Sequence, residues 1–403
     1  MTSSLSDAPG SAPGSALGVF RVFLRLGMTS FGGPVAHLGY FREEFVERKK
    51  WMGEKEYADI VALCQFLPGP ASSQVGMAVG LRRAGFAGML AAWAAFTLPS
   101  VVLMVAFALG VARLGDIAGA GWLLGLKAAA VAVVAHAVLG MATNLVTDRW
   151  RALIAAAAAC VVLLVPGPFA QVAAIALGAL GGLALPRKRS EFGPDTAERA
   201  SRVPVPVAVA CLGAFVALLV VLPILARTGG PAAHIFDTFY RAGALVFGGG
   251  HVVLPLLEQA TVPPGLVDHD TFLAGYGAAQ AVPGPLFTFA SFLGASAHGV
   301  TWWWGALVAT VAIFLPAALL VVGALPFWES LRRHSAAAGV FAGANAAVVG
   351  ILGAALYNPV FTAGVTGATT MAVAVAAFTA LQAWKAPAWA VVIGAALVGA
   401  VAL

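Results

Sequence analysis

The sequence predicts an all-α polytopic membrane protein built from two inverted-topology repeats. Three observations lead to this class: the composition, a broken motif that occurs twice, and a change in the side on which charges lie. Of the 403 residues, 61% are hydrophobic and 10% are charged, and apolar runs near the roughly 20 residues needed to cross a bilayer recur along the chain. Each repeat is expected to contain broken or re-entrant helical hairpins that carry Phe-Gly-Gly and Pro-Gly-Pro tips.

The composition also excludes other classes of protein. No polar stretch is long enough for a separate soluble domain, so the lipid bilayer is the expected environment. Cys64, Cys160 and Cys211 lie in apolar segments without ligand-like spacing, which predicts neither a disulfide framework nor a metal site, and no cofactor is expected. The net charge of +6 comes largely from short stretches between apolar segments, which indicates topology rather than nucleic-acid binding.

Five parts are expected along the chain. Residues 1–15 are interpreted as a disordered N-terminal tail, since they are rich in small residues and lack the charged start of a signal peptide. The N-terminal membrane repeat is expected at 16–185, a basic cytoplasmic linker at 186–202, a connecting transmembrane helix at 203–226 and the C-terminal membrane repeat at 232–403. Spans of the first repeat are expected at 85–112, 117–142, 153–165 and 171–185.

The motif Pro68-Gly69-Pro70 breaks one apolar segment and returns as Pro283-Gly284-Pro285 in another. Membrane helices tolerate such breaks where the freed backbone groups face protein or a polar cavity rather than lipid. The segments beside the first break are about a dozen residues or fewer, which is too short to span. Lys49-Lys50 and Arg82-Arg83 flank them, and if both pairs are cytoplasmic the chain must form a re-entrant hairpin.

The second half of the chain repeats the motifs of the first. Arg25 and Arg241 lie 216 residues apart, and Gln65 and Gln280 lie 215 apart. The extra span at 203–226 would invert the second copy, and acidic Asp268-His269-Asp270 indeed stands where the first copy has basic pairs. Inverted repeats with broken helices are a recurring transporter plan in which the substrate binds at the repeat interface.

Three cations are candidates for binding a substrate anion. Arginine inside a membrane is costly unless it is functional or reaches the surface, and the planar guanidinium of Arg25 or Arg241 suits an oxyanion. The alternative is that these arginines snorkel or pair with acids such as Asp237 or Glu43. Lys127 lies within a long apolar span and could bind the anion, or snorkel instead.

The two kinds of tip complete the predicted substrate site. Half-helices that begin after each Pro-Gly-Pro should aim their N–H groups and positive dipole ends inward, where they favour an anion; the alternative is that the polar residues only satisfy broken backbone. The remaining predicted substrate-binding residues are Gln65, Pro68, Gly69, Pro70, Ser72, Ser73, Gln280, Pro283, Gly284, Pro285 and Thr288, and at the other tips Phe31, Gly32, Gly33, Phe247, Gly248 and Gly249.

Candidates for ion coupling are His37, Glu43, Glu44 and His251, because protonation of a buried imidazole or carboxylate changes the charge of a site. The alternative for the glutamates is a solvated face, since the pattern of 37–50 places apolar residues on one side of a helix and glutamates on the other. His136, in the span that carries Lys127, is expected to pack or to bond another helix.

The motifs Phe-Gly-Gly-Pro at 31–34, Gln-Phe-Leu-Pro-Gly-Pro at 65–70, Phe-Gly-Gly-Gly-His at 247–251 and Gln-Ala-Val-Pro-Gly-Pro at 280–285 occur in this order. With them the chain resembles the chromate ion transporters in their two-domain, long-chain form, over approximately 19–185 and 236–403. The resemblance implies export of chromate across the bacterial cytoplasmic (inner) membrane, hence chromate resistance, energised by the membrane potential or by protons. Gly250-His251 replaces Pro34-Val35 after the second Phe-Gly-Gly, so the two tips differ chemically.

Three functions compete at this point. The first is a secondary transporter for a divalent tetrahedral oxyanion such as chromate, and the second is a carrier for sulfate or another inorganic oxyanion on the same architecture. The third is a membrane-embedded enzyme acting on a phosphorylated lipid. The sequence argues against it, because it contains no clustered Asp, His or Ser set with catalytic spacing. The sequence leaves open a homodimer and whether the first Phe-Gly-Gly segment re-enters or spans.

Overall fold

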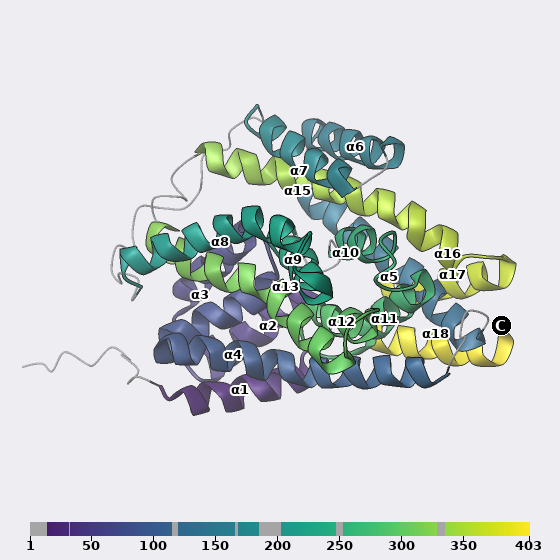
Figure 1. Ribbon diagram of the computed structural model, residues 1–403, viewed down its shortest axis with the longest axis horizontal. Helices are drawn as coiled ribbons and strands as arrows, with labels where there is room; N and C mark the ends of the chain where they lie inside the picture. Colours follow the sequence, from purple (N-terminus) through teal and green to yellow (C-terminus); the bar gives the residue numbers. More distant parts are fainter. Residues whose placement is uncertain are drawn as a thin grey trace, which may run out of the picture.

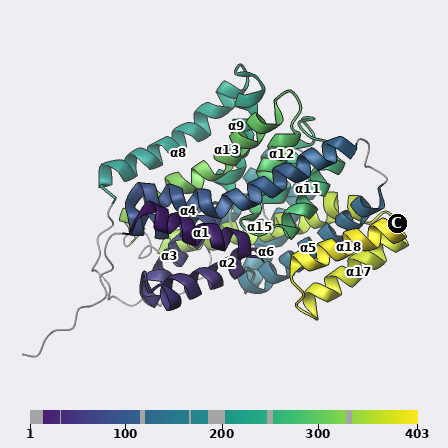
Figure 2. The same ribbon diagram turned by 90° about the horizontal axis from the view of Figure 1, so that it is seen from below.

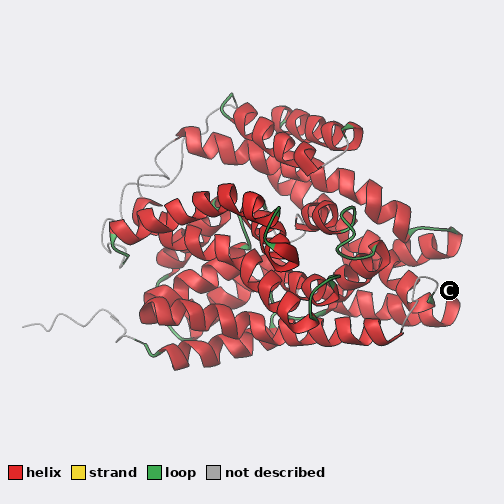
Figure 3. Ribbon diagram, in the orientation of Figure 1, coloured by secondary structure: helices red, strands yellow, loops and turns green. Residues whose placement is uncertain are grey.

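The computed structural model describes residues 14–31, 33–114, 120–165, 168–184, 203–246, 253–328 and 335–403. Throughout these ranges the regular secondary structure is helical, and no strand occurs in them (Figures 1 and 3). The predicted all-α class is therefore confirmed for the described part of the chain.

The described residues up to 184 form one series of helices. They are α1 (Ala16–Thr29), α2 (Gly33–Arg42), the π-helix η1 (Glu43–Arg48), α3 (Glu54–Phe66), α4 (Ala71–Leu114), α5 (Gly121–Leu145), α6 (Arg149–Leu164) and α7 (Pro168–Gly182). Side-chain caps set two of their starts, because Ser15 accepts from Gly18 N at 3.0 Å and Asp148 accepts from the first N–H groups of α6. At Ala84 and Gly85 the backbone of α4 leaves helical geometry, which separates a short helix after the Pro-Gly-Pro from a long apolar one.

The described residues from 203 onward form a second series. They are α8 (Val205–Ala226), α9 (Gly230–Leu245), α10 (Val253–Thr261), α11 (His269–Ala281), the 3₁₀ turn η3 (Leu286–Thr288), α12 (Phe289–Ser296), α13 (Trp302–Ala324), the 3₁₀ turn η4 (Leu325–Phe327), α15 (Ser335–Ala355), the π-helix η5 (Leu356–Phe361), α16 (Thr362–Gly364), α17 (Ala368–Gln382) and α18 (Ala388–Ala402). The half-helix expected to begin at Leu286 is therefore a 3₁₀ turn that leads into α12.

Five of the described helices are long and apolar enough to cross a bilayer. They are Ala71–Arg113, Gly121–Leu145, Val205–Ala226, Trp302–Phe327 and Gly339–Gly364. The segments expected to span at 153–165 and 171–185 form α6 and α7, which have 16 and 15 residues and are thus about 24 Å long or less. That length is short of the roughly 30 Å hydrocarbon core. The two helices pack on each other and on α15.

Short helical hairpins are exchanged between the two halves of the chain. The α6–α7 hairpin packs on α15 of the second half, whereas the α17–α18 hairpin packs on α5 of the first (Figures 1 and 2). Glycines permit the close approach at both places: a Cβ at Gly178 would meet the Gly343 backbone, and a Cβ at Gly125 would meet the Ala395 backbone. The two halves are therefore interlocked rather than placed side by side.

An aromatic cluster fixes the first helices against α4. The rings of Phe23 on α1, Phe41 on α2 and Phe96 on α4 lie with centroids 5.7 Å apart for Phe23 and Phe41 and 5.1 Å apart for Phe41 and Phe96. All three side chains are buried, and such edge-to-face pairs contribute about 0.5–1.5 kcal/mol each beyond their buried area. The cluster holds α2 so that His37 packs edge-on against the Phe96 ring, with centroids 5.4 Å apart.

Candidate functional site

Each Pro-Gly-Pro tip is bonded to the half of the chain to which it does not belong. Gly69 N donates to the carbonyl of Val246 at the end of α9 (2.7 Å), and Gly284 N donates to the carbonyl of Ser30 at the end of α1 (2.8 Å). Both glycines have positive φ, 116° at Gly69 and 93° at Gly284, a region that only glycine enters at low cost. The breaks thus bring the two halves together at equivalent places.

The carbonyls freed by the second break accept hydrogen bonds from α4 and from Thr288. Ser100 on α4 donates its hydroxyl to the Pro283 carbonyl, and both the backbone N–H (3.0 Å) and the hydroxyl (2.8 Å) of Thr288 donate to Pro285 O. At the first break, Gln74 Nε2 donates to the Pro68 carbonyl at 2.8 Å. The hydroxyl proton of Thr288, a predicted substrate donor, is therefore engaged with the backbone.

A cavity of about 210 Å³ adjoins the second Pro-Gly-Pro tip. It lies where Gly33, from the first Phe-Gly-Gly tip, meets the end of α11, the middle of α5 and the link between α17 and α18. Its lining residues are Gly33, Val133, His136, Ala279, Gln280, Val282, Gly284, Leu286, Leu381, Ala386, Pro387 and Ala388. Gln280 lines this cavity, which is large enough for a small anion, and its buried Nε2 has no hydrogen-bond partner among the described residues.

His136 supplies the other polar side chain of this cavity. Its Nδ1 lies 3.0 Å from Oε1 of Gln382 on α17, which requires that Nδ1 carries the proton in this contact. The expected bond from His136 to another helix is thus confirmed, but its position in the cavity was missed. A histidine within an apolar span was the only signal that the sequence offered for it.

A second polar group lies at the start of α4. Ser72 Oγ is 3.3 Å from His37 Nδ1, and both side chains are buried together with Ser30 and Ser73. The hydroxyls of Ser30 and Ser73 have no partner among the described residues. The first N–H groups of a helix lack intrahelical acceptors and carry a partial positive charge, so this group can donate to an anion without any cationic side chain.

The predicted arginines are both paired with buried carboxylates. Arg25 bonds Glu44, and Arg241 NH2 lies 2.6 Å from Asp237 Oδ2 on the same helix. The arginine side chains are 47% and 43% exposed, whereas each carboxylate is 3% exposed. The expected alternative of pairing with Asp237 is confirmed; Arg25, however, takes Glu44 as its partner, and Glu43 is exposed.

The predicted solvated face therefore needs one correction. Glu44 was expected on the polar side with Glu43, but it is 2% exposed and lies beside buried Phe45. Residues 43–48 form a π-helix, whose wider turn shifts side chains relative to the 3.6-residue period on which the expectation rested. Arg48 lies 3.4 Å from the same carboxylate, so Glu44 faces two guanidinium groups.

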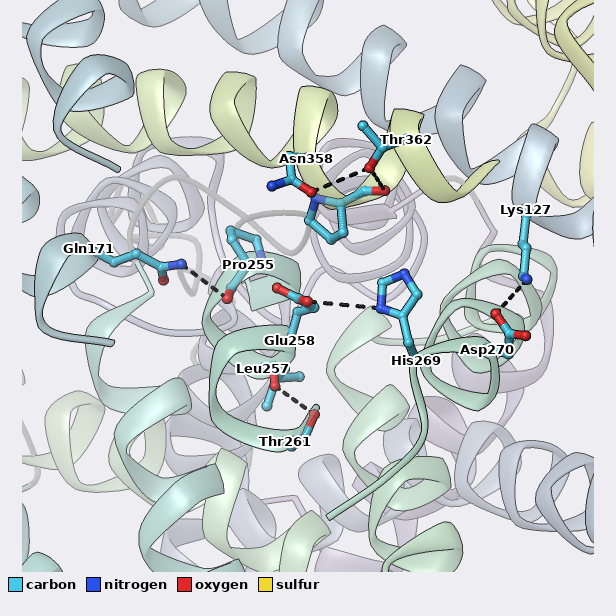
Figure 4. Close-up of polar contacts among 11 residues, drawn as sticks. Lys127, Gln171, Pro255, Leu257, Glu258, Thr261, His269, Asp270, Asn358 and Thr362 are labelled. Carbon is cyan, nitrogen blue, oxygen red and sulfur yellow. Dashed lines mark hydrogen bonds and ion pairs between the residues drawn. The ribbon is translucent and has the colours of Figure 1, made fainter. Parts of the chain in front are cut away.

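Lys127 is buried and ion-paired across the two halves. Its Nζ lies 2.6 Å from Asp270 Oδ1 on α11 (Figure 4), and the lysine side chain is 6% exposed. Lys127 thus does not snorkel to a surface in this structure. Its ammonium is held at the opposite end of α11 from Gln280 and the cavity.

Other predicted residues lie outside these groups. Gln65 is exposed, unlike its counterpart Gln280, and the ring of Phe31 lies 5.8 Å from that of Trp389 on α18. Gly32, Phe247, Gly248, Gly249 and His251 lie outside the described residues.

One ion cluster lies outside the membrane-spanning helices. Arg42 contacts Glu54 through Nε (2.6 Å) and Glu47 through NH1 (2.6 Å). The hydrogen bond and charge of Glu54 raise the pKa of Arg42 above its ordinary value, with a further contribution from Glu47. Because all three groups are exposed, salt screens this cluster and its contribution to stability is small.

These features define a class of protein: a multi-pass helical membrane protein whose broken helices meet around buried polar groups in its interior. Within that class, the chain belongs to the chromate transporter family, whose model matches residues 17–183 and again residues 233–400. The two matched segments correspond to the two series of helices and leave out α8.

Several curated proteins are similar over most of their length. The chain is 30% identical to the chromate transport protein of Pseudomonas aeruginosa over 356 residues, which cover 83% of this chain and 79% of that protein. It is 28% identical to the chromate transport protein of Cupriavidus metallidurans, with 94% and 91% covered. An uncharacterized transporter of Methanocaldococcus jannaschii is 27% identical, with 80% and 78% covered. No solved structure matches.

Proposed function

We propose that this protein is a secondary transporter that exports chromate, a divalent tetrahedral oxyanion, across the bacterial cytoplasmic (inner) membrane, and thereby gives resistance to chromate. Membership of the chromate transporter family and the chromate transport proteins among its relatives support the substrate. The observation that carries the site is the cavity beside Gly284, because Gln280 lines it and the buried Nε2 of this residue has no partner among the described residues.

The proposed topology is that of two inverted repeats, at 16–185 and 232–403, joined by the cytoplasmic linker 186–202 and the connecting helix 203–226. The double match to one family model supports a repeat. The crossed bonds from Gly69 to Val246 and from Gly284 to Ser30 support it as well, since they join equivalent positions of the two halves. The reversed charge bias of the loops supports the inversion.

The substrate is proposed to bind between the cavity and the start of α4. The bond from Gly284 N to Ser30 O places these two polar groups next to each other. The donors there are neutral: the Gln280 amide, the Ser73 hydroxyl and helix N–H groups. Neutral, fixed donors suit a dianion that has to be released again, because a full cation at the site would hold it tightly.

Arg25 and Arg241 are proposed to attract the anion at the two mouths of this path. Their guanidinium groups are nearly half exposed and are balanced by Glu44 and Asp237. Of the coupling candidates, Glu44 and His37 are buried beside the proposed path, which supports a role in charge compensation. The exposure of Glu43 favours a solvated face for that residue.

The test is uptake of radiolabelled chromate into everted membrane vesicles that contain the full chain, with sulfate as competitor. Export in cells corresponds to accumulation in these vesicles, and uptake above vesicles without the protein is the expected result. Sulfate uptake without chromate uptake would assign the alternative of a sulfate carrier. Consumption of a phosphorylated lipid without flux of either anion would assign the alternative of an enzyme.

A further inference from the structure

A chain of four ionisable side chains lies apart from the proposed anion path. It begins with Glu258 on α10, passes to His269 and Asp270 at the start of α11, and ends at Lys127 on α5 (Figure 4). Glu258 Oε1 lies 3.9 Å from His269 Nδ1, and Asp270 Oδ1 lies 2.6 Å from Lys127 Nζ. Figure 4 shows the His269 imidazole between the Glu258 carboxylate and the ion pair.

Among the described residues, no Lys or Arg forms an ion pair with Glu258. Its side chain is 11% exposed, and among the described residues His269 is the only basic group within ion-pair distance. A separation of 3.9 Å is too long for a hydrogen bond. A buried carboxylate without a partner is costly, so a proton gained by Glu258 or by His269 removes that cost.

The start of α11 makes the proton affinity of His269 depend on Glu258. Burial lowers the pKa of His269, while the charge of Asp270 raises it and that of Lys127 lowers it. The positive end of the helix dipole also disfavours an imidazolium at the first residue of a helix. The carboxylate of Glu258 is then the group whose approach decides whether the proton stays. When Glu258 Oε1 moves closer to His269 Nδ1 than 3.9 Å, the pair binds a proton. When the two atoms move apart, the pair releases it.

Other titratable groups lie only on some of the described elements around this site. Among the elements that pack on α10 or α11, namely α4, α5, α7, α9, η3, α12, α15 and α18, the sequences of α7, η3, α12, α15 and α18 contain no Asp, Glu, His, Lys or Arg. The charged or titratable groups on the others are Lys127 and His136 of α5, Arg82, Arg83 and Arg113 of α4, and His234, Asp237, Tyr240 and Arg241 of α9, with Asp268 and Tyr276 beside or on α11 itself.

Hydrogen bonds to backbone carbonyls hold α10 and the start of α11 relative to each other. Gln171 on α7 donates to the Pro255 carbonyl (3.2 Å), and Leu266 N donates to Thr261 O (2.9 Å) in the link between α10 and α11. His298 contacts the Gly265 carbonyl at 3.0 Å. The backbone connection between Glu258 and His269 is thus braced, so their separation changes either by rotation of the two side chains or by movement of α10 or α11.

The helix α11 joins this group to the proposed anion path. Asp270 lies in its first turn, whereas Gln280 lies next to its last residue and lines the cavity. Their separation of ten positions corresponds to about 15 Å of helix. Helix α5 runs beside both places, since Lys127 bonds Asp270 and His136 lines the cavity. A tilt of α11 would alter the cavity and the Glu258–His269 gap together.

We propose that Glu258 and His269 form a proton-binding site that couples proton movement to anion transport through α11. This inference rests on the proposed oxyanion transport. With Lys127 charged, Asp270 and Glu258 ionised and His269 neutral, the group carries one net negative charge, and the bound proton makes it neutral. Loading and release of that proton therefore change the charge of the protein by one unit in each cycle.

The experiment compares chromate accumulation in proteoliposomes of the full chain with and without an imposed difference of one pH unit. For one coupled proton, the wild type should change its accumulation ratio about tenfold, because one unit corresponds to about 1.36 kcal/mol. Glu258→Gln and His269→Gln should lose this dependence but keep exchange of labelled for unlabelled chromate. Asp268→Asn, which removes an exposed acid next to the site, should keep the tenfold change.

Three results would overturn the proposal: no pH dependence in the wild type, a wild-type dependence retained in Glu258→Gln, or its loss in Asp268→Asn. Failure of the proposed function is distinct, because the wild type would then show no chromate exchange at all. If neither site variant can be purified, proton uptake or release by the wild type on addition of chromate, followed with a pH indicator, decides the matter. Absence of any proton exchange in that measurement overturns the site.

Discussion

Gly284 donates its backbone N–H to the carbonyl of Ser30, and thereby ties the second Pro-Gly-Pro tip to the end of the first helix of the chain. The bond at 2.8 Å has a counterpart in the bond from Gly69 to Val246 at 2.7 Å. Two equivalent bonds that cross between the halves explain why both tips carry glycine with positive φ. The bond from Gly284 to Ser30 also brings the second Pro-Gly-Pro tip next to Gly33, and both Gly284 and Gly33 line the cavity.

The first prediction is that Gly284→Ala impairs transport more than folding. At φ of 93° an alanine is strained, by about 1–3 kcal/mol, and its Cβ would overlap the Ser100 hydroxyl that bonds Pro283. Displacement of the tip should lower the maximal rate of chromate uptake severalfold, while size-exclusion profiles stay monodisperse. Gly213→Ala on α8, where a Cβ meets nothing within 4 Å, is the matched control and should transport as the wild type.

The second prediction concerns the buried ion pair between Lys127 and Asp270. Asp270→Asn leaves an ammonium that is 6% exposed without its counter-charge, and breaking a buried pair costs about 3–5 kcal/mol. Lys127→Met leaves a carboxylate that is 35% exposed and can turn to water, so its cost should be smaller. Thermal unfolding in detergent should therefore rank Asp270→Asn below Lys127→Met.

The double variant Lys127→Met with Asp270→Asn completes this test, because it removes both charges. It should be more stable than Asp270→Asn alone, as expected for groups in direct contact. Additive losses in the double variant would show that the pair is not coupled, whereas equal melting temperatures for the two single variants would contradict the predicted ranking.

How much of this arrangement was predictable depends on how local each signal is. Hydrophobic runs and paired Pro-Gly-Pro breaks are properties of short segments. The helical class and the helix breaks at Gly69 and Gly284 were therefore predictable. The burial of Glu44 was not, since the expectation assumed an α-helical period where the chain forms a π-helix. The difference between exposed Gln65 and cavity-lining Gln280 depends on tertiary packing, which the shared Pro-Gly-Pro that follows both residues does not reveal.

The packing of short hairpins from one half of the chain on helices of the other half could not be predicted from the sequence. The repeats were expected as blocks at 16–185 and 232–403, yet α6 and α7 pack on α15 while α17 and α18 pack on α5. Apolar helices with small residues can pack on many surfaces. The sequence of such a helix therefore does not indicate which other helix it will contact. His136 and Gln382 meet for this reason: they come from α5 and from the hairpin that crosses over to it.

The third prediction separates the two glutamines of the motif. Gln280→Glu puts a negative charge into the cavity, and like charges about 4 Å apart repel by about 4 kcal/mol at an effective dielectric constant of 20. Because about 1.4 kcal/mol corresponds to a factor of ten, the KM for chromate uptake should rise several hundredfold. Gln65→Glu changes an exposed side chain of the same motif and should raise KM less. Equal effects of the two substitutions would contradict the placement of the anion beside Gln280.

The last prediction tests the proposed inversion of the repeats. Glu54 at the start of α3 and Asp268 just before α11 occupy equivalent places in the two halves, and both are exposed. Inverted repeats place them on opposite sides of the membrane, because the re-entrant hairpins enter from opposite faces. Single cysteines should be introduced as Glu54→Cys and Asp268→Cys in a chain whose three native cysteines have been replaced.

A membrane-impermeant thiol reagent added to intact cells should label Asp268→Cys but not Glu54→Cys, and in everted vesicles the pattern should reverse. The cysteine-free chain, unlabelled in both preparations, is the control for background. Because the cytoplasmic side is assigned from Lys49, Lys50, Arg82 and Arg83, complete reversal of the pattern would invert the whole protein but keep the repeat relation. Labelling of both positions from one side would contradict that relation, and with it the idea that the anion passes between two hairpins entering from opposite faces.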